Sequence, residues 1–219
     1  MRNTLQRAGV IACLVALAGC AVVALMPVTP VLAMLAGHTD HVTASEIAAL
    51  EKKQDWPGML RYAEAKLRAE PRNSDWMFLR GYSLARQGKH AEAIVAYNQA
   101  LQLSPEDESS WIFLGNSQRE LGQFDQAIRT FEQALRYRPE SATSYLALAD
   151  TYAKQKRFER AVPNYRESVR YEPNLLEGWY GLAVAYQQLG LVARRDEALA
   201  GVRKLSAPAA AAFEKEYVK

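Results

Sequence analysis

Cysteine is nearly absent from this chain of 219 residues. Cys13 and Cys20 are the only two, and both lie in an apolar segment near the N-terminus. The rest of the chain therefore has neither a disulfide framework nor a thiolate zinc site. This distribution is compatible with any redox compartment and identifies none.

Neither sign of charge is in large excess. There are 27 lysines and arginines against 24 acidic residues, a formal net charge of +3 at pH 7. The sequence has no basic run or stripe, so we expect no nucleic-acid partner. Hydrophobic residues make up 49% of the chain, which is enough to bury a core.

Patterns typical of enzymes and metal sites are also missing. The three histidines are His38, His41 and His90, and the first two belong to a short polar stretch with Asp40. A metal site needs more ligands in a fixed geometry. There is no nucleophile elbow, phosphate-binding glycine loop or paired-carboxylate site. We therefore expect no enzyme activity, no metal and no cofactor.

An apolar segment near the N-terminus predicts export. Residues 8–26 contain no charge, and Arg2 and Arg7 precede them. Nineteen helical residues span about 28 Å, close to the thickness of the bilayer core. Histidines aside, the next basic residue is Lys52. By the positive-inside rule the N-terminus stays in the cytoplasm and the body is exported, so we interpret residues 1–36 as a signal or membrane-anchor segment.

Three modes of export remain open. Leu17-Ala18-Gly19-Cys20 resembles the lipobox of bacterial lipoproteins, in which Cys20 would be acylated after cleavage. An uncleaved anchor from about Ala8 to Met26 better accounts for the apolar residues after Cys20. Cleavage after Ala33 would release a soluble form. The first two modes attach the protein to a membrane of the bacterial cell envelope, with its body in the periplasm.

The body of the chain repeats every 34 residues. The residues on this grid are Pro71, Pro105, Pro139 and Pro173; Gly88, Gly122 and Gly190; Ala93, Ala127 and Ala161; and Tyr97, Phe131 and Tyr165. Lys156 takes the place of the missing glycine. Agreement among four kinds of residue identifies a repeat protein.

Each repeat reads as a helical hairpin. Apolar residues recur at helical spacing from Trp111 to Leu121, Gly122 breaks the helix, and a second stripe covers residues 124–135. Pro139 ends the second helix. The expected N-caps of the next helices are Asn73, Asp107 and Ser141. We further expect the small residues Gly81, Gly115, Ala149 and Ala183 to face Ala93, Ala127 and Ala161 across each hairpin.

These landmarks resemble the tetratricopeptide repeat (TPR), a helix–turn–helix of 34 residues with W-x2-L-G-x2-Y, A-x3-F and P positions. Trp111, Leu114 and Gly115 match the first landmark, although Gln118 stands where tyrosine is expected. The resemblance covers about residues 74–205. It implies an all-α solenoid, a right-handed superhelix of about four to five repeats with a C-terminal capping helix.

The repeat divides the chain into segments. The predicted boundaries are 37–73 for a linker and degenerate first TPR, 74–107, 108–141 and 142–175 for regular TPRs, and 176–219 for a divergent last TPR with its cap. We expect a capping box at Thr43 to start the first helix, and a final helix from Ala209 to Val218 with Phe213 and Tyr217 on its inner face. Trp111, Tyr145 and Trp179 are expected to fill the core between repeats.

The resemblance also implies a concave groove lined by the first helix of each repeat. One expected row is Phe78, Ile112, Leu146 and Tyr180; a second is Tyr82, Asn116, Asp150 and Val184; a third is Arg86, Glu120, Lys154 and Gln188. Partly exposed apolar side chains in the first row would suit a partner. Packing of the same row against the neighbouring helix is the alternative.

The expected ligand of this groove is a protein or peptide. Some TPR domains hold a C-terminal carboxylate with lysine and asparagine, but the matching positions here are Phe78, Tyr82, Phe113, Thr143 and Ala147. An amphipathic helix or extended apolar peptide fits better. Our hypothesis is a membrane-tethered envelope adaptor in the assembly or maturation of a complex. The alternative is a scaffold that self-associates as a homo-oligomer.

Overall fold

The computed structural model describes residues 41–218. Helices account for nearly all of this range, and short turns join them. The helices are α3 (His41–Lys52), α4 (Trp56–Ala69), α5 (Ser74–Arg86), α6 (His90–Leu103), α7 (Glu108–Glu120), α8 (Phe124–Tyr137), α9 (Ala142–Lys154), α10 (Phe158–Tyr171), α11 (Leu176–Gln188), α12 (Val192–Leu205) and α13 (Ala207–Tyr217).

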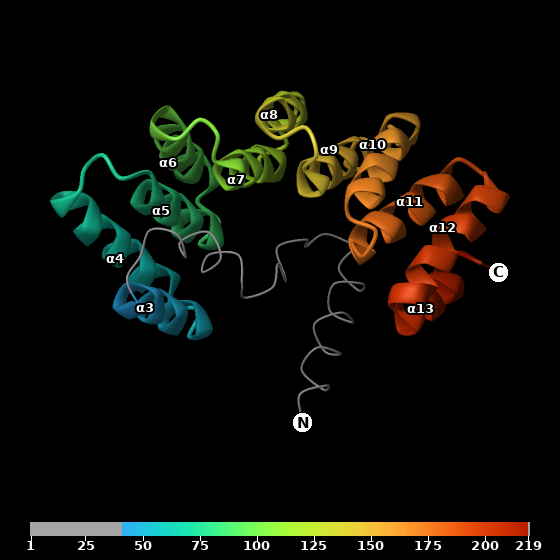
Figure 1. The fold of residues 1–219 in the computed structure, drawn as a ribbon, viewed down its shortest axis with the longest axis horizontal. Coiled ribbons are helices and arrows are strands. Elements are labelled where there is room, and N and C mark those ends of the chain that lie inside the picture. Colours follow the sequence, from blue (N-terminus) through green and yellow to red (C-terminus); the bar gives the residue numbers. More distant parts are fainter. Residues whose placement is uncertain (1–40, 219) are drawn as a thin grey trace.

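The helices form an arc of stacked hairpins (Figure 1). Helices α5, α7, α9 and α11 lie on its inner side, and α6, α8 and α10 lie on its outer side. Each helix packs mainly against the helices before and after it in the chain. The predicted solenoid of helical hairpins is confirmed.

The predicted N-caps start the inner helices. The side chains of Asn73, Asp107 and Ser141 each accept a hydrogen bond from a backbone N–H two or three residues further on, at 2.9 Å. These bonds satisfy donors that the first turn of a helix leaves unpaired. Helix α11 follows Leu175, which has no side-chain cap.

The turn inside each hairpin requires a left-handed residue. Gly88, Gly122 and Gly190 have φ of 76°, 74° and 70°. Lys156, at the same place in the repeat, has φ of 59°. The turn therefore requires the left-handed backbone conformation at this position. Lys156 adopts that conformation, although the Cβ of a lysine makes it unfavourable.

Lys156→Gly is expected to raise the free energy of unfolding by about 1 kcal/mol, because glycine removes the left-handed strain. Urea denaturation followed by circular dichroism measures this. The matched control is Gly122→Ala in the preceding hairpin, which should lower stability by a similar amount. A destabilised Lys156→Gly protein would show that the lysine side chain contributes more than its backbone strain costs.

The two helices of a hairpin approach closely at glycine. A Cβ added at Gly81 would lie 2.7 Å from the ring of Tyr97, and one at Gly115 would lie 2.4 Å from the ring of Phe131. The two helices approach closely here, as we expected, but the glycines do not face the alanines that we predicted. The nearest atoms to these glycines belong to the aromatic ring of the second helix, not to the alanine one turn earlier.

The aromatic residues near the start of the inner helices contact their own hairpins, and Trp111 and Trp179 also bond to the end of the preceding repeat. Trp111 stacks on Tyr137, with ring centroids 6.0 Å apart, and its indole Nε1 donates to the Pro105 carbonyl at 2.7 Å. Tyr145 stacks on Tyr171 at 5.8 Å. Trp111 also packs against the core cluster of the preceding repeats. Because Trp111, Tyr145 and Trp179 are half-buried, they fill the space between repeats only in part.

The two ends of the described solenoid differ from the expectation in detail. Helix α3 begins at His41, so Thr43 lies inside the helix and not at its N-cap. Helix α13 begins two residues before the predicted start, where the Ser206 hydroxyl accepts the Ala209 N–H at 3.3 Å. Phe213 of α13 is fully buried and Tyr217 half-buried.

A buried arginine fastens the C-terminal cap. Arg195 of α12 is 8% exposed, and its guanidinium donates to the Gln187 side-chain oxygen on α11 at 2.7 Å. Gln187 in turn donates to the Tyr217 carbonyl on α13 at 3.3 Å. This chain of hydrogen bonds explains why an arginine replaces the repeat's usual alanine where the solenoid ends.

Candidate functional site

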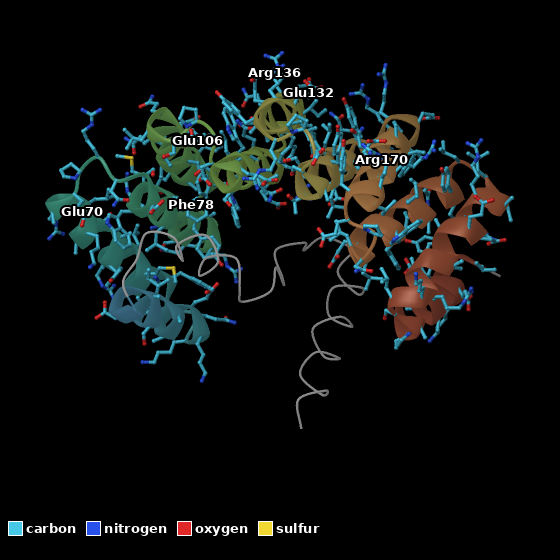
Figure 2. All side chains as sticks on the ribbon, viewed as in Figure 1. Glu70, Phe78, Glu106, Glu132, Arg136 and Arg170 are labelled. Carbon is cyan, nitrogen blue, oxygen red and sulfur yellow. The ribbon has the colours of Figure 1, made fainter. Side chains whose placement is uncertain are left out.

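The first predicted groove row is mostly buried. Phe78, Ile112 and Tyr180 are 4%, 7% and 2% exposed, and Leu146 is half-buried. Figure 2 shows Phe78 toward the inner side of the arc, whereas Glu132 and Arg136 lie on its outer side. The expectation of four partly exposed apolar side chains is therefore wrong for three of them.

Packing against the first helix of the next hairpin, or against the capping helix α13, accounts for the burial of Phe78 and Tyr180. The ring of Phe78 on α5 lies 5.4 Å from that of Phe113 on α7. The ring of Tyr180 on α11 lies 5.6 Å from that of Phe213 on α13. Leu146 is less covered, and the residue of α11 that corresponds to Phe113 is Gly181, which has no side chain. The row is chiefly a contact between repeats.

The second row is polar at its centre. Tyr82 is buried, and its hydroxyl donates to Glu51 at 3.1 Å. Burial, followed by the charge of Glu51, raises the pKa of Tyr82 to about 12. Asn116 and Asp150 are half-buried and lie on α7 and α9, in the middle of the arc.

These central residues belong to a larger group that we call the central polar cluster: Asn116, Arg119, Glu120, Asp150 and Lys154. The Asp150 carboxylate accepts the Tyr165 hydroxyl at 2.7 Å, and Lys154 Nζ lies 3.4 Å from Glu120 Oε1. Burial raises the pKa of Asp150, and the positive charge of Arg119 opposes this shift. The cluster carries two charges of each sign.

Two buried atoms of the cluster have no hydrogen-bond partner among the described residues. They are the Asn116 side-chain oxygen and Arg119 Nε. Leaving a buried polar group unpaired costs about 1–3 kcal/mol. A bound chain that supplied a donor and an acceptor here would recover part of that cost.

Sequence reasoning missed Arg119. The predicted rows were built from every fourth residue, Asn116 and Glu120 on α7. Residues three apart on a helix also share a face. That spacing places Arg119 beside Asn116, and it is the signal that would have found this side chain.

The third row has no uniform character. The Arg86 guanidinium lies 4.3 Å from the centroid of the Trp56 ring and is half-buried. Glu120 and Lys154 form the ion pair described above, and Gln188 is exposed.

Within residues 41–218 no group of histidine, cysteine or acidic side chains is placed to hold a metal ion. No helix in the same range is both long and apolar enough to cross a membrane. The predicted signal or anchor segment and its lipidation candidate, Cys20, lie outside the described residues.

Family comparison agrees with this architecture. Models described as tetratricopeptide repeat match residues 73–140, 114–170 and 146–194, which together cover more than half of the chain. The chain belongs to the TPR family. The TPR fold supports a role as a protein–protein interaction adaptor or scaffold.

Solved structures with a similar fold include MamA proteins. A crystal structure of MamA has a TM-score of 0.62 and 21% identity, over 82% of this chain and 98% of that one. MamA 41-end from Desulfovibrio magneticus RS-1 has a TM-score of 0.64 and 18% identity, over 74% and 91% of the two chains. At these identities the similarity shows the fold alone. A sequence comparison with curated proteins gave no match.

Proposed function

We propose that this TPR protein is a membrane-tethered adaptor of the bacterial cell envelope, which binds a partner peptide or helix on its concave face. The observation that carries the proposal is the pair of unpartnered buried atoms, the Asn116 oxygen and Arg119 Nε. A protein core ordinarily satisfies such atoms. A partner chain on the inner side of the arc would supply these bonds once its docking turned the two half-buried side chains toward it.

The side chains around the cluster define the partner's chemistry. Half-buried Phe113, Leu146 and Val184 lie on the inner helices α7, α9 and α11 and leave apolar surface there. The partner therefore needs apolar side chains next to hydrogen-bonding groups, as in an amphipathic helix or an extended apolar peptide. Since the cluster carries both signs of charge, the partner needs no strong net charge.

Membrane tethering rests on the sequence of residues 1–36. Arg2 and Arg7 before an uncharged stretch favour export with the TPR body in the periplasm. Lipidation at Cys20, an uncleaved anchor and a cleaved soluble form remain the three modes. In the first two, the concave face would recruit its partner close to the membrane, for the assembly or maturation of an envelope complex.

Photo-crosslinking in the native host tests this proposal. The full-length protein carries a photoreactive amino acid at Asn116, and a control variant carries it at Arg129, an exposed residue of the outer helix α8. We expect a discrete adduct with another protein from position 116 and none from position 129, with mass spectrometry naming the partner.

Other crosslinking results would contradict the adaptor. Adducts of the chain only with itself would instead support the self-associating scaffold, and sedimentation of the purified protein would then show an oligomer. Equal labelling from both positions, or none from either, would remove the concave face as a specific binding site.

A further inference from the structure

A buried carboxyl group joins the first described helix to the solenoid. Glu51, in the last turn of α3, is 6% exposed. Its Oε1 accepts the hydroxyl of Tyr82 on α5 at 3.1 Å. Its Oε2 is buried and has no hydrogen-bond partner among the described residues.

The surroundings of Glu51 do not supply a matching positive charge at contact distance. Arg86 on α5 acts on it electrostatically, but no salt bridge joins the two side chains in the described part of the chain. The Arg86 guanidinium lies instead over the ring of Trp56 on α4. Thus α5 presents Tyr82 and Arg86 to Glu51, and α4 contributes an aromatic ring that holds Arg86.

Burial favours the neutral form of this group. Loss of solvent raises the pKa of Glu51 above its ordinary value of 4.5, and the hydrogen bond from Tyr82 and the charge of Arg86 lower it by less. A neutral carboxyl group is much cheaper to bury than a carboxylate with one unpaired oxygen.

Few buried side chains hold α3 in place. Ile47 is fully buried in the core cluster that includes Met59 and Leu79, and Leu50 is partly buried against it. Glu51 is the remaining buried residue whose burial is described in this helix. Because α3 lies at one end of the arc (Figure 1), no further hairpin of the described chain covers its outer side. The ionisation of one buried carboxyl group therefore matters to whether α3 stays docked.

We propose that docking of α3 onto the solenoid is coupled to uptake of a proton by Glu51, so that α3 is held firmly at acidic pH and loosens as the pH rises. This device is separate from partner binding on the concave face. In the tethered protein, α3 connects the TPR body to residues 1–36, and its release would lengthen that connection.

The direction follows from linkage. With α3 undocked, Glu51 is in water and its pKa returns to the ordinary value of 4.5. Below that value the carboxyl is neutral in both states, and docking has its full stability. As the pH rises from 4.5 through the raised pKa of the docked state, only the undocked state has lost its proton. Docking weakens across this window and then stays constant.

Hydrogen exchange of α3 measures this coupling. The full-length protein in detergent is exchanged between pH 4.5 and pH 8, with rates corrected for intrinsic chemistry, and peptides covering residues 44–52 are followed by mass spectrometry. We expect the opening equilibrium of α3 in the wild type to rise with pH, by up to about tenfold per pH unit inside the window. In Glu51→Gln it should be independent of pH.

Two further variants make the test specific. Glu46→Gln removes an exposed carboxylate from the same helix and should keep the wild-type slope. Tyr82→Phe removes a hydrogen bond that lowers the pKa of Glu51, so the window should extend to higher pH. Equal slopes for the wild type and Glu51→Gln, or wild-type protection that grows with pH, would overturn the proposal.

Discussion

Phe131→Ala is expected to lower the free energy of unfolding by about 3–5 kcal/mol, the range for removing a large aromatic side chain from a core. Phe131 on α8 is fully buried in a cluster with Ile112, Ala127 and Leu148. It also fills the space over Gly115. Because neighbouring repeats of a solenoid stabilise one another, a cavity in a central repeat weakens the contacts on both sides. Urea denaturation of the wild type and variant measures the loss.

Trp111→Ala is the informative comparison. Sequence alone favours the tryptophans as core residues, but Trp111 is half-buried, and its ring rests on Tyr137, which is 52% exposed. We expect the tryptophan variant to lose clearly less stability than Phe131→Ala. If Trp111→Ala and Phe131→Ala lowered the free energy of unfolding equally, the half-buried Trp111 ring would stabilise the fold as much as the fully buried Phe131 ring.

Gly115→Ala is expected to destabilise the protein by about 1–3 kcal/mol, as overpacked cores do. The added Cβ would lie 2.4 Å from Cε1 of Phe131 and 2.5 Å from its Cζ. In an unobstructed helix the same change would stabilise by about 1 kcal/mol, because alanine is the better helix former. The sign of the measured change therefore reports whether the ring can move away.

A double-mutant cycle isolates this contact. Phe131→Leu removes the ring atoms that the new Cβ would meet, so Gly115→Ala in that background should be neutral or stabilising. The difference between the two backgrounds gives the coupling between the residues. An equal loss in both backgrounds would place the cause elsewhere, in the surroundings of α7 and not in the ring.

The candidate site was only partly predictable. Asn116, Glu120, Asp150 and Lys154 were identified because the resemblance to TPR proteins implies that these positions of the repeat line the concave groove. The sequence could not predict that polar atoms of Asn116 and Arg119 lack hydrogen-bond partners, because this depends on which neighbours come within hydrogen-bond distance after folding. Likewise, nothing in the sequence distinguishes Glu51 from a surface glutamate near the end of a helix. Only the tertiary structure shows that it is buried against Tyr82.

By itself the sequence determined the hairpins, their period of 34 residues and the places where helices begin and turn. These are local features: an N-cap such as Asp107, a left-handed turn at Gly122 and an apolar stripe act over a few residues. Only the tertiary structure decided which residues of the concave face are covered. Phe78 on α5 packs against Phe113 on α7, and Tyr180 on α11 packs against Phe213 on α13. The burial of these groove residues depends on the size of a side chain more than thirty residues away, so a local sequence pattern cannot predict it.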